Sequence, residues 1–374
     1  MAEPDIRAGV ENLLLNCGGM ARGERLLILC EEPDEAYYCP RIAEAVRTHA
    51  AACGIDTATR IVPFDPLGTE LSADLTREME SAHRTLFLSR CGDQLRFSEK
   101  MRGVRPIMSY ALDVAALSSG FGTAHHRGFV ALRDAVNALL AQAANIRVTC
   151  PLGTDFSGPG AVFPPGPADV TVDRFPMLVF APVPVAGFSG TIVQDGFLVG
   201  TGSRFYTPYG VPLRRPVAIH FEEARLREIT GEPEDVATVE AHYRHVGGLF
   251  GLEPFTLHSW HAGIHPGCAH SAPAAANFER WSGSAFGNPR LLHVHTCGDY
   301  APGEISLNVL DPTITVDGVE IWSAGCLNPA RVPGGAEILA RYPCVRAVFD
   351  APCREVGQGP DGRLCGVTPG APRP

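Results

Sequence analysis

The sequence predicts an α/β protein with two domains: an N-terminal domain built on a doubly wound parallel sheet, and a β-rich α+β C-terminal domain. Three observations support this fold class. Over residues 1–150, short apolar runs alternate with helical patterns, which is typical of a parallel sheet covered by helices on both faces. Residues 151–168 are rich in proline and glycine, and this composition indicates a loop or linker. Strand patterns dominate the chain beyond them.

The N-terminal elements follow from the spacing of apolar residues. These residues recur at helical spacing over residues 5–20, and Gly18-Gly19 ends this predicted helix. The continuous apolar run Arg25–Cys30 predicts a buried strand. The same two patterns predict helices over residues 36–53, 71–83 and 128–144, and strands over residues 59–64, 84–89 and 146–150.

The C-terminal elements are mostly short strands bounded by glycine or proline, and they are expected over residues 177–180, 190–199, 217–221, 291–295, 305–310 and 313–321. Asp195-Gly196 and Asp317-Gly318 predict tight hairpin turns. An amphipathic helix is expected over Pro233–Phe250. We therefore expect an α/β domain at residues 1–150, a β-rich domain at 151–356, and a disordered tail at 357–374, where proline and glycine dominate.

Composition excludes several classes of partner. The net charge of −10 argues against a nucleic-acid backbone or an anionic membrane as partner, because both need a basic patch. No run of about 18 apolar residues predicts a transmembrane helix. The start of the chain is acidic, unlike a signal peptide, and the cysteines are scattered singly, as reduced thiols are. We therefore expect a cytoplasmic protein with a small-molecule substrate.

Two common catalytic motifs are absent. No Gly-x-Ser-x-Gly elbow indicates a serine nucleophile, and no Gly-x-x-x-x-Gly-Lys loop indicates nucleotide-dependent chemistry. Lys100 is the single lysine. It is therefore the only amine side chain that lysine-based covalent catalysis could use.

A histidine-rich stretch of the C-terminal domain is the candidate site, because six of the thirteen histidines lie between His258 and His295. Imidazole and carboxylate groups suit iron, zinc and manganese. His293 and His295 share a face if they lie on a strand. His261 and His265 share a face in either a strand or a helix, whereas His258 and His261 share one only in a helix.

The sequence predicts a metal site in the C-terminal domain with ligands drawn from His258, His261, His265, His295 and Glu304. His293 is the predicted general base, with the His125-His126 pair as an alternative source of this group. Asp299 is a second candidate catalytic residue, which would orient a ligand or the substrate. The competing interpretation is that these histidines are structural, since a single histidine is more often a hydrogen-bonded polar residue than a ligand.

Five stretches of the chain carry a family resemblance, the third and fourth of them as a pair. IRAGVENLLLNCGGMARGERLLILC and IRVTCPLGTDFSG lie in the first half, and GFSGTIVQDG with AIHFEEARLREITG, and then ITVDGVEIWSAG, follow in the second. They resemble, in order, the N-terminal start, the beginning of the second domain, the paired strands and the closing hairpin of the thermophilic-type metallo-aminopeptidase family. That family also contains the non-haem iron enzyme 2,5-dihydroxypyridine 5,6-dioxygenase.

The departures from this family imply its dioxygenase-like branch. Its aminopeptidases hold two metals with several carboxylates, yet Met177 or Leu178 stands where the first glutamate would fall, and the His258–His265 segment stands where the second would. The family's His-x-Asp pair reads Glu304-Ile305-Ser306 here. The resemblance therefore implies a single Fe(II), with Glu304 as the carboxylate and His295 in place of the missing histidine.

We expect a mononuclear non-haem iron enzyme of the dioxygenase type, acting on a small aromatic or heteroaromatic compound, with open metal positions for substrate and O₂. One alternative is a metallohydrolase, an amidase or aminopeptidase, in which Zn²⁺ or Mn²⁺ activates water and Glu304 is the base. Another is a metal-free relative that serves in binding or assembly. Because family members are dimers or larger, the resemblance also implies a homodimer.

Overall fold

The computed structural model describes residues 6–33, 37–68, 71–101, 103–104, 106–161 and 170–364. The chain divides into two compact units. Unit 1 comprises Met1–Val130, Pro165–Met177 and Arg341–Pro352, and unit 2 comprises Ala131–Pro164, Leu178–Ala340 and Cys353–Pro374. Among the described residues, no helix has both the length and the apolar character needed to cross a bilayer.

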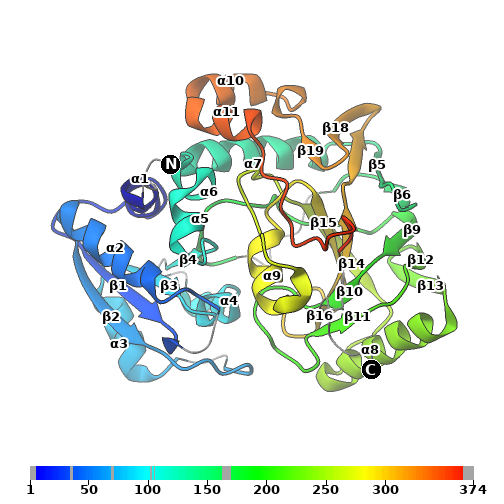
Figure 1. The fold of residues 1–374 in the computed structure, drawn as a ribbon, viewed down its shortest axis with the longest axis horizontal. Coiled ribbons are helices and arrows are strands. Elements are labelled where there is room, and N and C mark those ends of the chain that lie inside the picture. The colour runs from blue at the N-terminus through cyan, green and yellow to red at the C-terminus, as the bar shows by residue number, and fades with distance from the viewer. Residues whose placement is uncertain are drawn as a thin grey trace. The chain divides into compact units, whose positions relative to one another are not determined.

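Unit 1 is a parallel sheet with helices on both faces, as predicted (Figure 1). The strand order is β2-β1-β3-β4-β7. The strands are β1 (Arg25–Cys30), β2 (Asp56–Ile61), β3 (Arg84–Leu88), β4 (Ile107–Ser109) and β7 (Asp173–Phe175). The helices are α1 (Ile6–Glu11), continued by a π-helical turn at Asn12–Cys17, α2 (Arg41–Ala52), α3 (Ala73–Ser81), α4 (Cys91–Leu95), α5 (Val114–Ser118), α6 (Gly120–Thr123) and α11 (Pro343–Asp350), with a 3-10 turn at Glu99–Met101.

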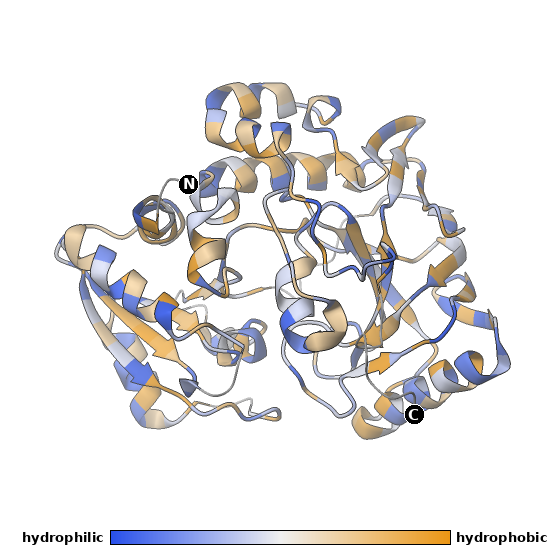
Figure 2. Cartoon of the chain, in the orientation of Figure 1, coloured by the Kyte–Doolittle hydropathy of each residue, from blue (hydrophilic) through white to orange (hydrophobic). Residues whose placement is uncertain are grey.

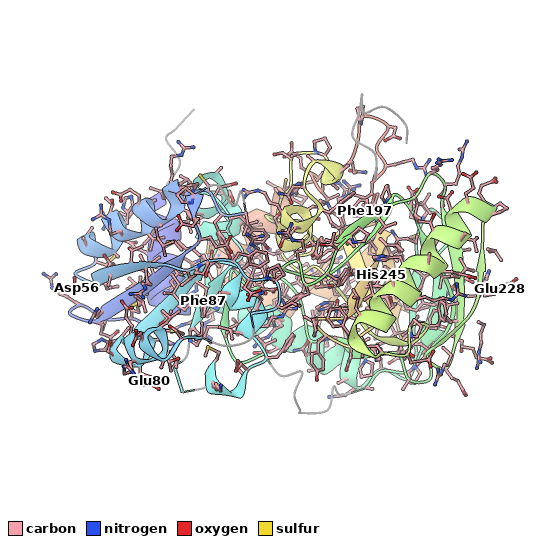
Figure 3. The ribbon with its side chains drawn as sticks, turned by 90° about the horizontal axis from the view of Figure 1, so that it is seen from below. Asp56, Glu80, Phe87, Phe197, Glu228 and His245 are labelled. Atoms are coloured by element: carbon pink, nitrogen blue, oxygen red, sulfur yellow. The ribbon has the colours of Figure 1, made fainter. Side chains whose placement is uncertain are left out.

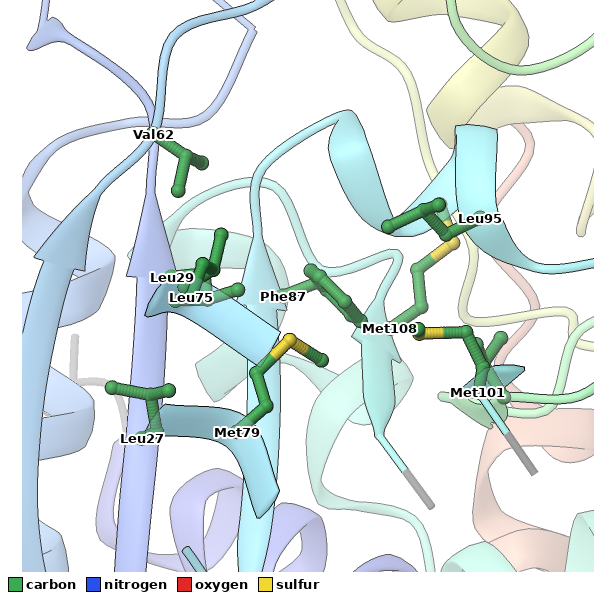
Figure 4. Close-up of a cluster of buried hydrophobic side chains, with 10 residues drawn as sticks. Leu27, Leu29, Val62, Leu75, Met79, Phe87, Leu95, Met101 and Met108 are labelled. Carbon is green, nitrogen blue, oxygen red and sulfur yellow. The ribbon is translucent and has the colours of Figure 1, made fainter. Parts of the chain in front are cut away.

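Strand β1, which lies between β2 and β3, is buried on both sides, which explains its continuous apolar sequence. Leu27 and Leu29 pack with Leu75 and Met79 of α3 and with Phe87 of β3 (Figure 4). The alternate residues of β1 point to the other face, where α1 and α2 lie (Figure 1). The hydropathy colouring marks β1 as hydrophobic along most of its length (Figure 2). Figure 3 shows Phe87 in the interior of this unit, with Asp56 and Glu80 at its outer edge.

The strand predicted at residues 146–150 does not belong to the parallel sheet. The run Ile146–Thr149 forms β5, which pairs antiparallel with β6 and β17 in unit 2. Ile146 and Val148 are buried while Arg147 is exposed, and such alternation is typical of an antiparallel strand with one buried face. The parallel sheet is completed instead by β4 and β7, neither of which was predicted from the sequence.

The described residues of unit 2 form two antiparallel sheets (Figure 1). Their strand orders are β11-β10-β16-β15-β14-β8 and β13-β12-β9-β6-β5-β17-β18-β19. The strands not yet bounded are β6 (Asp155–Gly158), β8 (Val183–Pro184), β9 (Ser189–Gln194), β10 (Phe197–Val199), β11 (Gly210–Pro212), β12 (Val217–Glu222), β13 (Arg225–Thr230), β14 (Leu257–Ala262), β15 (Leu291–Cys297), β16 (Glu304–Leu310), β17 (Thr313–Val316), β18 (Val319–Ser323) and β19 (Cys326–Leu327). The helices are α8 (Pro233–Phe250), α9 (Phe278–Ala285) and α10 (Gly335–Arg341), with 3-10 turns at Ala274–Ala276 and Pro329–Arg331. Helix α7 (His126–Ala141) has residues in both units.

Aromatic side chains pack the two sheets of unit 2 together. Trp260 of β14 in the six-stranded sheet contacts the ring of Phe156 of β6 in the eight-stranded sheet, with ring centroids 6.1 Å apart. Phe188 joins the same cluster, at 6.1 Å from Trp260. Phe221 of β12 lies 5.7 Å from Phe156. One face of the six-stranded sheet therefore forms part of the core between the two sheets.

The two predicted hairpins have different outcomes. Asp317-Gly318 joins the paired strands β17 and β18, and both residues have positive φ, as a tight hairpin turn requires. Asp195-Gly196 does not form a hairpin, because β9 and β10 belong to different sheets. The turn instead carries the chain from one sheet to the other. The local sequence of a turn does not specify which strands pair across it.

The division into units differs from the predicted boundaries at residues 150 and 356. Residues 131–150 belong to unit 2, and unit 1 gains the later segments 165–177 and 341–352, because spatial packing rather than order in the chain defines a compact unit. In the tail predicted to be disordered, residues 357–364 are described, and Leu364 is buried against Trp281 and Val356. Residues 365–374 lie outside the described part of the chain.

Candidate metal centre

Three neighbouring strands of the six-stranded sheet position the candidate site. In this sheet β15 lies between β14 and β16. His261 of β14 is directly opposite His293 of β15, and His295 is directly opposite Ser259 of β14. Residues directly opposite each other in an antiparallel pair project to the same side, and so do residues two apart on one strand. The three histidines therefore share one face of the sheet.

This face is the one turned away from the second sheet, because the intervening residue Trp260 points into the core between the sheets. Helix α9 and the segment after it cover the histidine face: Phe286 stacks on the ring of His293, with centroids 4.2 Å apart. Phe286 also packs with Trp281 of α9 in a buried cluster that includes Phe197 of β10. Figure 3 shows Phe197 among the residues of unit 2.

The imidazole rings of these histidines converge through their Nε2 atoms. The His261 Nε2 atom lies 2.6 Å from the His293 Nε2 and 3.2 Å from the His295 Nε2. One potential ligand atom from each ring lies within 4.8 Å of the others. All three residues are buried, at 7%, 2% and 7% exposure in chain order. Among the described residues, they form the one group of three such side chains that could hold a metal ion.

Hydrogen bonds at the opposite ring nitrogens orient two of these imidazoles. The His261 Nδ1 donates to the main-chain carbonyl of Phe180 at 3.0 Å. A carbonyl can only accept, so the neutral ring carries its proton on Nδ1 and has a lone pair on Nε2. The His295 Nδ1 lies 3.1 Å from the Ser259 hydroxyl, which can accept in the same way. This arrangement is the one by which proteins orient histidine ligands.

Glu304 adds a carboxylate at the edge of the group. It is the first residue of β16, is 3% exposed, and places Oε1 3.6 Å from the His295 Nε2. The Thr201 hydroxyl donates to the same Oε1, and the Tyr206 hydroxyl donates to the main-chain carbonyl of Glu304 at 2.8 Å. Three nitrogen donors and one oxygen donor match the ligand chemistry of divalent iron, zinc and manganese.

His258 lies outside this group, although it was a predicted ligand. The pairing of β14 with β15 shifts between Leu257 and Ser259, so His258 occupies a bulge and does not share the face of His261. Its Nε2 donates to the main-chain carbonyl of Cys297 at 3.0 Å. The sequence did not distinguish helix from strand for this segment. In a strand, two residues that are three positions apart, such as His258 and His261, face opposite ways.

His265 also lies outside the group, because β14 ends at Ala262. It is fully buried, and its Nδ1 accepts a hydrogen bond from the Gly267 main-chain N–H at 3.2 Å. The predicted catalytic residue Asp299 is half-buried beyond the end of β15. Burial raises the pKa of its carboxyl group, and the charge of nearby His258 acts against this shift.

Two further histidine sites are separate from this group. His270 bonds through Nδ1 to the Ser284 hydroxyl at 2.7 Å. His125 and His126 lie in unit 1, where their rings contact Tyr342 and Phe175 at centroid distances of 4.9 and 6.0 Å.

Ser259 and Thr201, which contact this group, were not predicted from the sequence. His293 was predicted as a general base, and in the structure it lies among the three histidines that could hold a metal ion. Its spacing from His295 already indicated a shared face. Ser259 stands two residues before His261, so a strand pattern would have placed both side chains on the same face. Thr201 has no such signal, because the sheet pairing of distant segments brings it to Glu304.

Comparisons with known proteins add information on the fold. No protein-family model matches the sequence, and no curated protein matches it. Among solved structures, the chain is similar to 2,5-dihydroxypyridine dioxygenase from Pseudomonas putida KT2440, with a TM-score of 0.54 and 15% identity over 86% of this chain and 96% of that one. It is also similar to wild-type AmpT from Thermus thermophilus, with a TM-score of 0.49 and 12% identity over 86% and 98% of the two chains. The chain therefore shares the fold of 2,5-dihydroxypyridine dioxygenase, and the predicted fold relationship is confirmed.

Proposed function

We propose that this protein is a mononuclear non-haem iron enzyme of the dioxygenase type, acting on a small aromatic or heteroaromatic compound. The observation that carries the proposal is the convergence of the Nε2 atoms of His261, His293 and His295 beside the carboxylate of Glu304. Histidines combined with one carboxylate are a common donor set for Fe(II) in oxygenases. The fold shared with a dioxygenase supports the same class.

The residues present fit a divalent metal. A neutral His261 with its proton on Nδ1 directs a lone pair toward two other imidazole nitrogens, and a cation at that point would relieve the crowding of these atoms. His261, His293, His295 and Glu304 would hold the ion. When bound, Fe(II) would supply the electron transfer that a reaction of an organic substrate with O₂ requires.

The protein's own side chains would bind and shield the substrate. The donor set carries a single negative charge, from Glu304, so a divalent cation within it retains a net positive charge. That charge favours a substrate that binds as an anion, such as a hydroxylated aromatic ring. The burial of the histidines and the stacking of Phe286 on His293 keep bulk water from this face.

A metallohydrolase, an amidase or aminopeptidase using Zn²⁺ or Mn²⁺, is the second candidate. The observation that favours it is the position of Glu304, whose Oε1 is 3.6 Å from the His295 Nε2. A carboxylate at this point could accept a proton from a water molecule bound beside the imidazoles, as a general base does.

Metal analysis of protein purified without oxygen separates these candidates. We expect close to one iron per chain, and O₂ consumption when hydroxylated pyridines or catechols are added. Zinc or manganese with release of amino acids from peptide amides would instead establish the hydrolase. Protein that takes up none of these metals would exclude both enzymes and favour a role in binding or assembly.

We also propose that the protein is a homodimer, as the family resemblance implies. Sedimentation equilibrium of the full chain should give twice the chain mass of 39.9 kDa. A single species at the chain mass would contradict this proposal without affecting the metal site.

A further inference from the structure

We propose that two hydroxyl groups, those of Thr201 and Ser259, are positioning elements of the metal site, one orienting Glu304 and the other orienting His295. This inference rests on the proposed function, since it concerns the same donor set. Neither residue belongs to that set: each acts through a residue that does.

Thr201 orients the carboxylate of Glu304. An ionised carboxylate offers no hydrogen, so the Thr201 hydroxyl is the donor and Oε1 the acceptor. This is the oxygen that lies 3.6 Å from the His295 Nε2. The Tyr206 hydroxyl holds the main chain of Glu304 at the same time, at 2.8 Å. Hydrogen bonds therefore hold both the carboxylate oxygen and the main chain of Glu304. Together they define the direction of the carboxylate relative to His295.

Gly200, which precedes Thr201, allows the chain to bring Thr201 to this position. Strand β10 ends at Val199, which pairs with Ser306 of β16, two residues from Glu304. At Gly200, which follows, an added Cβ would come within 2.5 Å of the Tyr209 ring and 3.1 Å of the Tyr206 hydroxyl. The absence of a side chain at Gly200 allows the chain to pass against these tyrosines, so that Thr201 can reach Glu304.

Ser259 orients His295 from the neighbouring strand. The two residues are directly opposite each other in the register of β14 and β15, and Ser259 is fully buried. With the Ser259 Oγ atom 3.1 Å from the His295 Nδ1, the hydroxyl can accept the Nδ1 hydrogen and leave the Nε2 lone pair for a metal. His261 has the same arrangement, but its partner is the main-chain carbonyl of Phe180. A side-chain substitution can therefore remove the hydrogen-bonding partner of His295, but it cannot remove the main-chain partner of His261.

The competing explanation is that both hydroxyls only satisfy buried polar groups and contribute to folding. Thr296 provides a matched control for this explanation. It is a fully buried residue of β15 next to His295, its hydroxyl bonds to Tyr243 at 2.7 Å, and it points to the opposite face of the sheet. Removal of its hydroxyl should affect folding in a similar way and leave the metal site intact.

The test measures Fe(II) affinity under anaerobic conditions, by competition with a chromogenic chelator, for the full chain and its variants. Outer-sphere partners of metal ligands typically contribute about 10–100-fold to metal affinity. We therefore expect Thr201→Val and Ser259→Ala each to weaken Fe(II) binding by about 10–100-fold. Thr201→Ser, which keeps the hydroxyl, and Thr296→Val should bind within a few-fold of wild type.

A second readout reports geometry instead of affinity. The visible absorption of Co(II) bound in place of iron depends on the direction of its ligands, so we expect its bands to shift in Thr201→Val and Ser259→Ala and to remain in Thr296→Val. Circular dichroism verifies that each variant is folded. If Thr201→Val does not fold, Thr201→Ala removes the same hydroxyl with less change in shape and should show the same loss.

The possible outcomes separate the two proposals. If wild-type protein binds neither Fe(II) nor Co(II), the proposed function fails and this inference fails with it. If wild type binds one ion per chain, and folded Thr201→Val and Ser259→Ala bind as tightly and with unchanged Co(II) bands, only the positioning roles are overturned. Equal losses in Thr296→Val would also overturn them, because they would indicate a general effect of removing a buried hydroxyl.

Discussion

His261 and His293 face each other across two neighbouring antiparallel strands, and their Nε2 atoms are 2.6 Å apart. His295 approaches the same His261 nitrogen at 3.2 Å. Because the His261 Nδ1 donates to the Phe180 carbonyl, the Nε2 of the neutral ring is an acceptor. One lone pair cannot bond well with both neighbours at once, whereas a metal ion can accept a lone pair from each of the three rings.

Removing any of the three converging imidazoles should abolish tight metal binding. For His261→Ala, His293→Ala and His295→Ala we expect Fe(II) affinity to fall by more than about 100-fold, because even outer-sphere partners contribute about 10–100-fold. Metal content after anaerobic purification and chelator competition would measure the effect.

His258→Ala is the control for these variants, because the His258 Nε2 donates to the Cys297 carbonyl instead of facing the group. It should retain near-stoichiometric metal. Full metal in His293→Ala together with loss in His258→Ala would contradict the arrangement of the site.

The buried residue His242 should make stability depend on pH. Burial, together with the charge of His245, lowers the pKa of His242 from 6.5 to about 4. The unfolded chain therefore binds one more proton than the folded chain between these pH values, so stability is lost as the pH falls from 6.5 toward 4. From neutral pH to pH 5, this group should lower the free energy of unfolding by about 2 kcal/mol.

Urea unfolding of His242→Gln at both pH values tests this contribution, and the pH dependence of the variant should be smaller by that amount. His245→Gln is the control. His245 is exposed on α8 (Figure 3), and its charge is the smaller cause of the shift. This variant should retain most of the pH dependence. Parallel pH profiles for wild type and His242→Gln would rule out the assignment to His242.

Gly263 should not tolerate a side chain. It follows β14 directly, and an added Cβ would overlap the main chain of Gly287 and Asn288. We expect Gly263→Ala to lower the free energy of unfolding by about 1–3 kcal/mol, because the interior would be overpacked. Gly248→Ala is the comparison: no atom lies within 4 Å of its added Cβ, and alanine favours the helix by up to about 1 kcal/mol. Similar thermal unfolding of the two variants would refute this account.

Removing the cationic partner of the buried residue Glu31 should destabilise unit 1. The Arg90 Nη2 atom lies 2.9 Å from the Glu31 Oε2 atom, and the side chains are 2% and 4% exposed, in that order. Arg90→Met leaves the Glu31 carboxylate buried without its partner, which typically costs about 3–5 kcal/mol of unfolding free energy. Arg47→Ala, which removes the exposed partner of Glu44, should change stability little. A small effect of Arg90→Met in urea unfolding would contradict the prediction.

Elements with strong local signals agree closely with the sequence analysis. The continuous apolar run Arg25–Cys30 predicts β1, and the structure has β1 at the same residues. Pro233 at the first helical position and the amphipathic spacing after it predict α8, which is observed over Pro233–Phe250. Strand β14 is different: the bulge at His258 breaks the alternation of its residues, so the segment has no periodic signal for either helix or strand.

Local patterns in the sequence predict the α/β class, many of the helices and strands, and the stretch of chain that supplies the three histidines. Which side chains meet depends on the tertiary structure. His261 and His293 are 32 residues apart, and the register of β14 against β15 places them together while the bulge turns His258 away. The packing of Trp260 against the second sheet determines which face of β14 turns toward that sheet and therefore which face presents the histidines. The register of two strands depends on many contacts between residues that are far apart in the sequence, and a local sequence pattern carries no information about these contacts.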